Sequence, residues 1–221
     1  TLQAISKKYQ IDSRNLYALN NITIQIKRGE FVAIMGPSGA GKTTLLNILG
    51  MLDTPTSGKY TFNTKEVTNI SEKELALIRK ESIGFVFQSS NLLSNYTLVQ
   101  NVQLPLIYRN RSVNTSRTEA LRLLQQLGLF DKQNNKPNQL SSGQQQKGAI
   151  ACALIQKPAI LFADEPTGNL DSVSTKEIVD ILKKLNKDKI TIVLVTHNQE
   201  VAKHANRIIY LKDGAISKQK S

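Results

Sequence analysis

The pattern of apolar and polar positions predicts strands that alternate with helices along this 221-residue chain. Short apolar runs typical of buried strands occupy residues 30–35, 59–62, 83–87, 159–163 and 191–196. Helical patterns occupy residues 44–52, 71–80 and 172–185. Two longer strand patterns, at 1–9 and 18–26, flank a polar turn at 12–15 near the N-terminus, and residues 208–211 and 214–217 favour a closing hairpin. The alternation predicts an α/β fold with a mostly parallel sheet and an N-terminal antiparallel β region.

The middle of the chain follows a different pattern. Residues from about 89 to 156 contain no good strand, and their helical stretches are expected at 98–108, at 116–127 and from Gln144 to about Gln156. A polar loop rich in Asn and Gln lies at 133–139. We therefore expect one domain over residues 1–221, with a core at 1–88 and 157–221 and an inserted helical lobe at about 89–156.

Composition narrows the class of protein. A single cysteine rules out a disulfide framework, and no run approaches the roughly 18 apolar residues that a membrane span requires. No signal-peptide pattern is found in residues 1–13. These features predict a soluble, cytosolic location. The net charge of +12 allows binding to nucleic acid, attraction to an acidic lipid surface, or merely solvated lysines. No basic block with interleaved aromatic residues is present, so nucleic acid is not an expected partner.

A glycine-rich loop at residues 36–43 carries the first chemical signal. It follows an apolar strand and opens a helix, which is the context that a P-loop requires. Backbone at such glycines can approach phosphate oxygens, Lys42 can place its charge on the β- and γ-phosphates, and the Thr43 hydroxyl can ligate Mg²⁺. The residues expected to cradle the phosphates are Gly36, Ser38, Gly39, Ala40, Gly41, Lys42, Thr43 and Thr44.

A second helix start follows about a hundred residues later, in the small polar turn at 140–146. Backbone N–H groups at the start of a helix form an anion site, here around Ser141, Ser142, Gly143 and Gln144. One nucleotide needs only one such cradle. The second is best explained if it serves a nucleotide held by another copy of the chain.

Polar side chains follow three of the predicted strands. Asp164 is expected to hold Mg²⁺, and Glu165 beside it can orient or deprotonate an attacking water, although Glu165 could instead cap the next helix. Gln88 can reach Mg²⁺ or that water through its amide, and His197 can contact a γ-phosphate. Taken alone, a glutamine or a histidine at a strand end is more often structural.

Two further candidates, Asp171 and Tyr9, each have a functional and a structural interpretation. Asp171, in the run Asn169-Leu170-Asp171, is a candidate nucleotide contact or the cap of the helix that begins at Ser172. Tyr9 can stack on a nucleobase or pack as an ordinary strand residue. Cys152 is interpreted as a small buried side chain, and His204 as a structural residue within a helix.

Together these segments resemble the nucleotide-binding subunit of ABC transporters over essentially the whole chain. The resemblance rests on the P-loop at 36–43, a glutamine loop at Gln88 and a signature at 140–144. It rests also on the strand end Ile160-Leu161-Phe162-Ala163-Asp164-Glu165, a D-loop at 169–171 and a switch histidine at His197, all in the family's order.

The resemblance implies an ATPase that needs ATP and Mg²⁺ and works as a head-to-tail homodimer with two ATP molecules between its copies. Lys42 and Thr43 of one copy would face Ser141 and Gly143 of the other. Glu165 would be the catalytic base, His197 would contact the γ-phosphate, and Tyr9 would stack on adenine. A membrane permease would dock on the helical lobe near residues 88–97, which places the subunit on the inner face of the cell membrane.

Within the family, the segments at 83–88, 91–93, 101–106, 144–146 and 163–171 look like the macrolide-export and lipoprotein-releasing group, which includes antimicrobial-peptide exporters. That likeness predicts export or release, with a periplasmic or extracellular adaptor as a further partner. The alternatives are an uptake subunit for amino acids or similar solutes and a division-linked complex. A soluble ATPase acting on DNA or ribosomes would usually carry a long coiled coil or two ATPase domains in one chain.

Three positions depart from the family pattern. Ser142 stands where glycine is usual, Lys147 replaces a common arginine, and Cys152 occupies a place where arginine is frequent. These departures bear on the rate of hydrolysis and on interface contacts rather than on the fold.

Overall fold

The computed structural model describes residues 1–11 and 14–217. It contains two compact units, one formed by residues 1–80 with the chain from Thr191 onward, and one formed by residues 81–190. The second unit holds the whole of the helical region expected at 89–156, and also the strand and helix on either side of Asp164. The division into a core and an inserted lobe at 88 and 157 stays a prediction.

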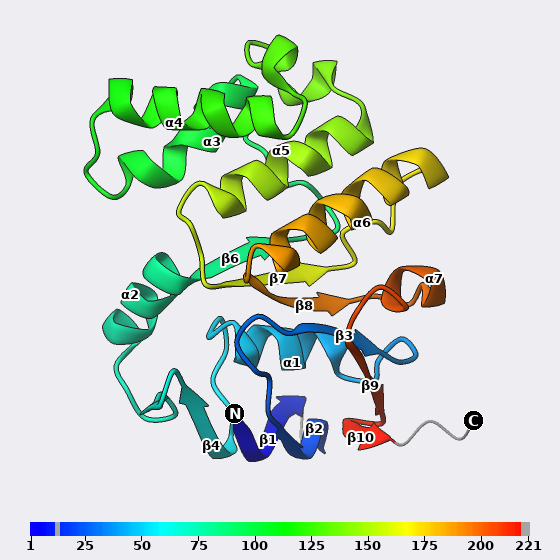
Figure 1. Ribbon diagram of the computed structural model, residues 1–221. Helices are drawn as coiled ribbons and strands as arrows, with labels where there is room; N and C mark the ends of the chain where they lie inside the picture. The colour runs from blue at the N-terminus through cyan, green and yellow to red at the C-terminus, as the bar shows by residue number, and fades with distance from the viewer. Residues whose placement is uncertain (12–13, 218–221) are drawn as a thin grey trace. The chain divides into compact units, whose positions relative to one another are not determined.

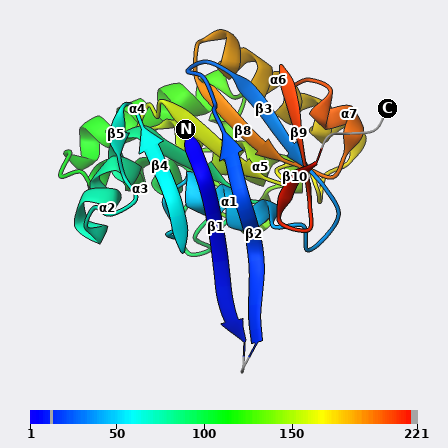
Figure 2. The ribbon, with the colours of Figure 1, turned by 90° about the horizontal axis from the view of Figure 1, so that it is seen from below.

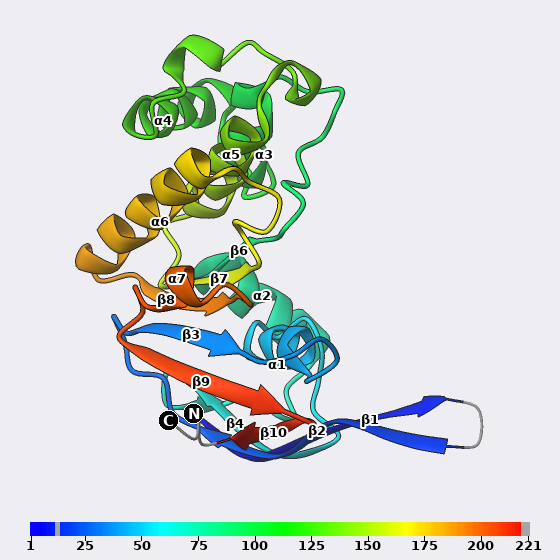
Figure 3. The same cartoon turned by 90° about the vertical axis from the view of Figure 1, so that its right-hand side faces the viewer.

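An antiparallel sheet forms the N-terminal part of the first unit, with its strands in the order β2-β1-β4-β5. The strands are β1 (Leu2–Ile11), β2 (Arg14–Ile24), β4 (Ser57–Phe62) and β5 (Lys65–Glu66). The β1–β2 hairpin is long, and its far end reaches well beyond β4 and β10 of the same unit (Figures 2 and 3). Asp12 and Ser13, in the middle of the expected turn, lie outside the described residues.

A second group of strands in this unit is parallel at its centre. Strand β3 (Phe31–Met35) pairs in parallel with β8 (Thr191–Val195) and β9 (Arg207–Lys212), and β9 turns back into β10 (Ala215–Ser217). Figure 3 shows β3 and β9 side by side. Every residue of β3 and β8 is buried, which explains why both read as continuous apolar runs rather than alternating ones.

Helices α1 and α2 form where the sequence predicts them, near residues 44–52 and 71–80. Helix α1 (Lys42–Leu49) follows β3 through the glycine loop and buries Leu45, Leu46, Ile48 and Leu49. Helix α2 (Glu72–Ser82) begins at the expected capping box, in which the Ser71 hydroxyl accepts a bond from the Glu74 N–H and the Glu74 carboxylate accepts one from the Ser71 N–H.

The second unit combines a parallel strand pair with four helices. Strand β6 (Ile83–Val86) pairs with β7 (Ile160–Asp164). The helices are α3 (Leu98–Ile107), α4 (Val113–Gln126), α5 (Ser142–Leu154) and α6 (Ser172–Lys187). Helices α3, α4 and α5 lie together in Figure 1 and share one apolar cluster, in which Leu98, Val102 and Leu124 are fully buried. The predicted α/β fold with an N-terminal antiparallel region is confirmed.

Several short elements were not expected. Strand β5 and helix α7 (Gln199–Ala202) are too short to leave a periodic pattern in the sequence. The placement of His204 in a helix is wrong: α7 ends at Ala202, and His204 lies in the turn that follows. Two 3₁₀ turns, η1 (Phe130–Lys132) and η2 (Pro137–Gln139), shape the polar loop before α5. Within the described ranges, none of the helices has the length and apolarity needed to cross a bilayer.

Candidate functional site

The glycine loop between β3 and α1 fits closely against backbone of its own unit. A Cβ on Gly36 would lie 2.1 Å from the Leu211 carbonyl oxygen, and one on Gly41 would lie 2.3 Å from the Ala18 carbonyl oxygen. Gly41 also has φ +96°, in the left-handed region that glycine favours. Only glycine fits at these two positions, so the loop keeps its conformation at the start of α1.

The start of α1 differs from the other long helices whose caps are described. Side chains satisfy an N–H group at the starts of α3, α4, α5 and α6, whereas Gly41 caps α1 without a side-chain hydrogen bond. A helix start with no side-chain cap is the kind of start at which backbone N–H groups can bind an anion. The Lys42 ammonium donates to the Gly36 and Pro37 carbonyl oxygens, at 2.9 and 2.8 Å, so its charge lies over the loop.

One side of the glycine loop is exposed, and the other is anchored to the rest of its unit. Pro37, Ser38, Gly39 and Thr43 are exposed, whereas Ala40 is 2% exposed and anchors the loop. The Ala40 carbonyl accepts a bond from the Gly214 N–H at 3.2 Å. The loop is held from beneath, and its outer side consists of small residues and backbone that a triphosphate can approach.

His197 follows a strand that runs beside the one leading into the loop. Ile34 pairs with Val195 in parallel register, and the Thr196 N–H donates to the Ile34 carbonyl at 3.2 Å. Parallel neighbours end at the same edge of a sheet, so exposed His197 and the glycine loop leave β8 and β3 at a common edge. The structure brings these two predicted features together.

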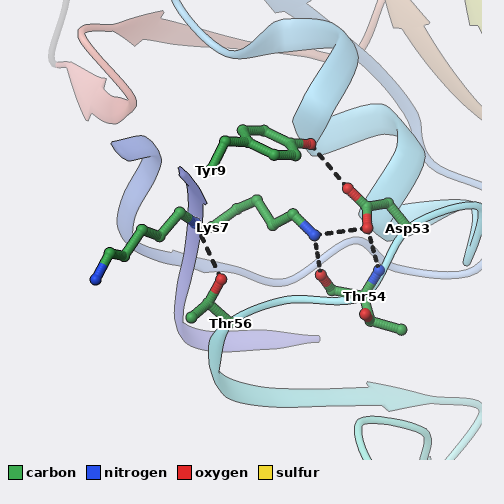
Figure 4. Close-up of polar contacts among 6 residues, drawn as sticks. Lys7, Tyr9, Asp53, Thr54 and Thr56 are labelled. Atoms are coloured by element: carbon green, nitrogen blue, oxygen red, sulfur yellow. Dashed lines mark hydrogen bonds and ion pairs between the residues drawn. The ribbon is translucent and has the colours of Figure 1, made fainter. Parts of the chain in front are cut away.

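Tyr9 lies on β1 with 38% of its surface exposed. Its hydroxyl donates to Asp53 Oδ2 at 2.8 Å (Figure 4). Burial alone would raise the pKa of Asp53, but hydrogen bonds from Lys7, Tyr9 and the Thr54 N–H, with the charge of Lys7, outweigh it and lower that pKa. The carboxylate is thus ionised and gives Tyr9 a fixed acceptor.

In the second unit, the predicted strand-end residues share one edge of the β6–β7 pair. Val86 pairs with Ala163 in parallel register, which brings Gln88 and the Asp164-Glu165 pair to the same end of the two strands. The Gln88 amide nitrogen lies 3.2 Å from Asn169 Oδ1. A Cβ on Gly168 would approach that nitrogen to 3.0 Å, so the glutamine packs on the turn that follows Glu165.

Glu165 has an unusual backbone. Its φ is +47°, in the left-handed region that residues with a Cβ seldom adopt. Its carbonyl accepts a bond from the Gly168 N–H at 3.0 Å, which closes the turn. Strained backbone of this kind concentrates at functional positions. The turn directs the residue after Asp164 away from the strand.

The signature segment begins α5 with a complete capping box. The Ser141 hydroxyl accepts a bond from the Gln144 N–H, and the Gln144 side chain accepts one from the Ser141 N–H. The Gln144 N–H is therefore already paired, and the anion site expected around residues 141–144 stays a prediction. The N–H groups of Ser142 and Gly143 have no acceptor within the helix and point out of its start.

Asp171 caps α6, and that helix lies against the signature. Asp171 Oδ1 accepts from the Val173 and Ser174 N–H groups, both at 2.9 Å, and its Oδ2 accepts from the Ser174 hydroxyl at 2.7 Å. A Cβ on Gly143 would lie 2.5 Å from Ser174 Oγ. The capping role of Asp171 is present, and Ser174 joins the D-loop to the signature glycine.

The structure shows the environment of each of the three residues that depart from the family pattern. Ser142 is the exposed first residue of α5. Lys147 pairs with Glu177 of α6 at 2.8 Å, so a cation is retained where arginine is common. Burial raises the pKa of the Cys152 thiol to about 12, which fits a packing residue of the α3–α5 cluster and not a nucleophile.

The predicted residues thus form two groups. Tyr9, the glycine loop and His197 belong to the first unit, and Gln88, Asp164, Glu165, the signature and Asp171 belong to the second. Sequence reasoning missed Lys7, Asp53 and Ser174. No motif marks them. Lys7 and Asp53 contact each other across a long stretch of sequence, and Ser174 packs against Gly143, which lies on another helix.

A glycine loop that follows a buried parallel strand, an uncapped helix start and a lysine above it define a nucleoside triphosphatase of the P-loop class. The family described as ABC transporter matches residues 19–168. The macrolide export ATP-binding/permease protein MacB of Bdellovibrio bacteriovorus is 51% identical over 215 residues, which are 97% of this chain and 33% of that protein. The chain spans about a third of the length of the MacB relatives.

Relatives of similar length are also found. The ABC transporter ATP-binding protein MJ0796 of Methanocaldococcus jannaschii is 46% identical over 223 residues, 99% of this chain and 95% of that protein. A solved structure of MJ0796, described as a dimeric post-hydrolysis state bound to ADP and Pi, matches with a TM-score of 0.91 over 100% of this chain and 97% of that one, at 46% identity. The chain belongs to the ABC transporter family. It is an ATP-binding cassette of that family and, as an enzyme, an ATPase.

Proposed function

We propose that this chain binds and hydrolyses MgATP as a homodimer and thereby powers export or release through a membrane permease. The observation that carries the proposal is that one chain has two helices that begin at a glycine-containing polar turn, α1 and α5. Since one nucleotide needs one cradle, the N–H groups of Ser142 and Gly143 are assigned to a nucleotide held by the other copy. The dimeric state described for the MJ0796 cassette supports this arrangement.

The residues of the first unit suit the capture of ATP. The first turn of α1 and Lys42 would bind the β- and γ-phosphates, with Gly36, Ser38, Gly39, Ala40, Gly41 and Thr44 completing the cradle. Tyr9 would stack on the base, and His197 would contact the γ-phosphate from the neighbouring strand end. The geometry of the loop and its uncapped helix supports these roles.

The residues of the second unit suit hydrolysis. Glu165 would accept the proton of the attacking water, and Gln88 would sense the nucleotide from the same strand edge. Mg²⁺ prefers oxygen ligands, and the Thr43 hydroxyl, the Asp164 carboxylate and the Gln88 amide would supply them. When bound, the metal neutralises charge on the phosphates. Ser141, Gln144 and Asp171 would hold the signature and D-loop at the opposite nucleotide.

Two observations support the proposals of export and of a membrane location: the names of similar proteins, and the exposed surface of residues 88–97. Proteins named for macrolide export match nearly all of this chain. The segment proposed to dock a permease, residues 88–97, exposes Leu93 by 46% and Tyr96 by 42%. Such apolar exposure suits a partner. The chain would then lie at the inner face of the cell membrane, and an adaptor beyond the membrane would complete an export system.

The substitution Glu165→Gln tests the proposal. It keeps the shape of the side chain but removes the proton acceptor, so hydrolysis should fall by at least about a hundredfold. The dimer should then persist in MgATP, which size-exclusion chromatography with light scattering would detect. EDTA should return the variant to the monomer, because the phosphate charge would no longer be neutralised.

Lys42→Ala is the matched control, since it should abolish nucleotide binding and with it any ATP-dependent dimer. If Glu165→Gln binds MgATP and yet remains monomeric over the concentrations at which it binds, the model of two nucleotides between two copies is wrong.

A further inference from the structure

Hydrogen bonds and an ion pair link the side chains of Lys7, Asp53 and Tyr9, and they fix the position of the Tyr9 ring. Lys7 Nζ forms an ion pair with Asp53 Oδ1 at 2.6 Å and donates to the Thr54 carbonyl at 2.7 Å, while the Tyr9 hydroxyl donates to Asp53 Oδ2 at 2.8 Å. Figure 4 shows Lys7 and Tyr9 extending in parallel from β1 toward Asp53. Both oxygens of the carboxylate are used, and the Thr54 N–H adds a third bond.

The cluster is more than a surface ion pair. The Lys7 side chain is only 12% exposed and that of Asp53 28%, whereas exposed pairs contribute little. The Lys7 ammonium also lies over the Tyr9 ring, 5.0 Å from its centroid. One face of the ring is therefore covered by a cation, and a planar ligand can stack only on the opposite face.

The same carboxylate ties the ring to helix α1. Asp53 follows the end of that helix, and its N–H donates to the carbonyl of Asn47 in α1 at 3.3 Å. The Tyr9 hydroxyl is thus bonded to a residue that is itself anchored on α1. The distance from the ring to the loop at Lys42 is set before any ligand arrives, which lowers the entropic cost of binding.

We propose that Asp53 and Lys7 are positioning residues for nucleobase recognition, which act by holding the Tyr9 ring in a stacking orientation at a fixed distance from the P-loop. The inference rests on the proposed function, because it requires the P-loop to hold the triphosphate. It identifies the ligand class as nucleotides with a stacking base. Since every base has a π face, binding should tolerate a change of purine and depend on the ring's orientation.

Titration calorimetry of the purified chain with two ligands tests the proposal: MgATP, and magnesium tripolyphosphate, which lacks the base. Asp53→Ala and Tyr9→Phe should each weaken MgATP binding about fivefold, the worth of one hydrogen bond. Neither should change the affinity for tripolyphosphate. The double variant should bind no more weakly than either single variant, because both changes break the same link.

Tyr9→Phe keeps the ring and removes only the hydroxyl. It therefore measures the effect of the Tyr9–Asp53 bond on MgATP affinity even if Asp53→Ala folds poorly. Glu66→Ala is the control, since it removes a 2.7 Å ion pair with Lys59 between β4 and β5 of the same unit. It should leave both affinities unchanged.

Three results would overturn the proposal. If both variants bind both ligands like the parent, the cluster only fastens β1 to the chain after α1. If the two ligands weaken equally, Asp53 supports the P-loop and not the base. If the parent binds MgATP no better than tripolyphosphate, no base is recognised at Tyr9, whereas a parent that binds neither ligand contradicts the proposed function itself.

Discussion

Ser174 shows how one small side chain links two functional segments. Its hydroxyl donates to Asp171 at 2.7 Å, and the same oxygen would lie 2.5 Å from a Cβ on Gly143. A serine at the start of α6 thus fills the space that the glycine of α5 leaves. The separation of the two segments depends on the absence of a single carbon atom.

Gly143→Ala should therefore destabilise the protein by about 1–3 kcal/mol, as expected for one methyl group forced into a filled space. Urea unfolding followed by circular dichroism would measure the loss. Ser174→Gly should also cost stability, about 1 kcal/mol, because glycine is unfavourable in a helix.

The double variant distinguishes this contact from a general intolerance of alanine. If the clash with Ser174 is the cause, Gly143→Ala should cost much less in the Ser174→Gly background than in the parent. Equal costs in the two backgrounds would show that the serine is not what excludes the methyl group.

At the scale of elements, three consecutive glutamines attach α5 to different partners. Gln144 completes the capping box, Gln145 donates to the Pro137 and Leu140 carbonyls, and Gln146 donates to the Phe87 carbonyl at 2.9 Å. Gln146 is 2% exposed. The start of the signature helix is thereby bonded to the residue that precedes Gln88.

Gln146→Leu should cost about 1–3 kcal/mol in the free energy of unfolding, because the Phe87 carbonyl would lose its donor in a site of low exposure. Urea titration provides the measurement. Gln126→Leu, on the exposed face of α4, is the matched control and should change stability by less than about 0.5 kcal/mol. Similar midpoints for the two variants would mean that the bond to Phe87 contributes nothing.

At the scale of the whole molecule, the signature would act only when two copies meet. Ser142, the exposed first residue of α5, stands where the family usually has glycine. Since the signature is proposed to serve the nucleotide of the other copy, Ser142 should have no part in the first capture of the nucleotide by α1. Its effect should be confined to steps that follow dimer closure.

Ser142→Gly should therefore raise the rate of ATP turnover, within about tenfold, because glycine allows a closer approach to phosphate. The Kd of MgATP for the single chain should be unchanged. Steady-state ATPase assays and titration of the monomer separate these quantities. An altered Kd with an unchanged turnover number would place this loop in the first capture of the nucleotide.

How far the sequence could predict the structure depends on the distance over which each feature is encoded. Strands β3 and β8 were predicted almost to the residue, because five buried positions in a row leave an unmistakable apolar run. Strand β5 and helix α7 were missed, because two and four residues are too few for a periodic pattern. The helix start at Ser141 was predicted, but not that its own side chains would pair the Gln144 N–H.

The sequence by itself determined the strand–loop–helix of the P-loop, the polar residues at the strand ends and membership of the ABC family, because each is written in consecutive residues. Only the tertiary structure decided that Tyr9 is held by Asp53, that Gly143 meets Ser174 and that Gln146 bonds Phe87. These contacts join segments 31 to 59 positions apart, and no local pattern specifies which distant side chain will fill a given space.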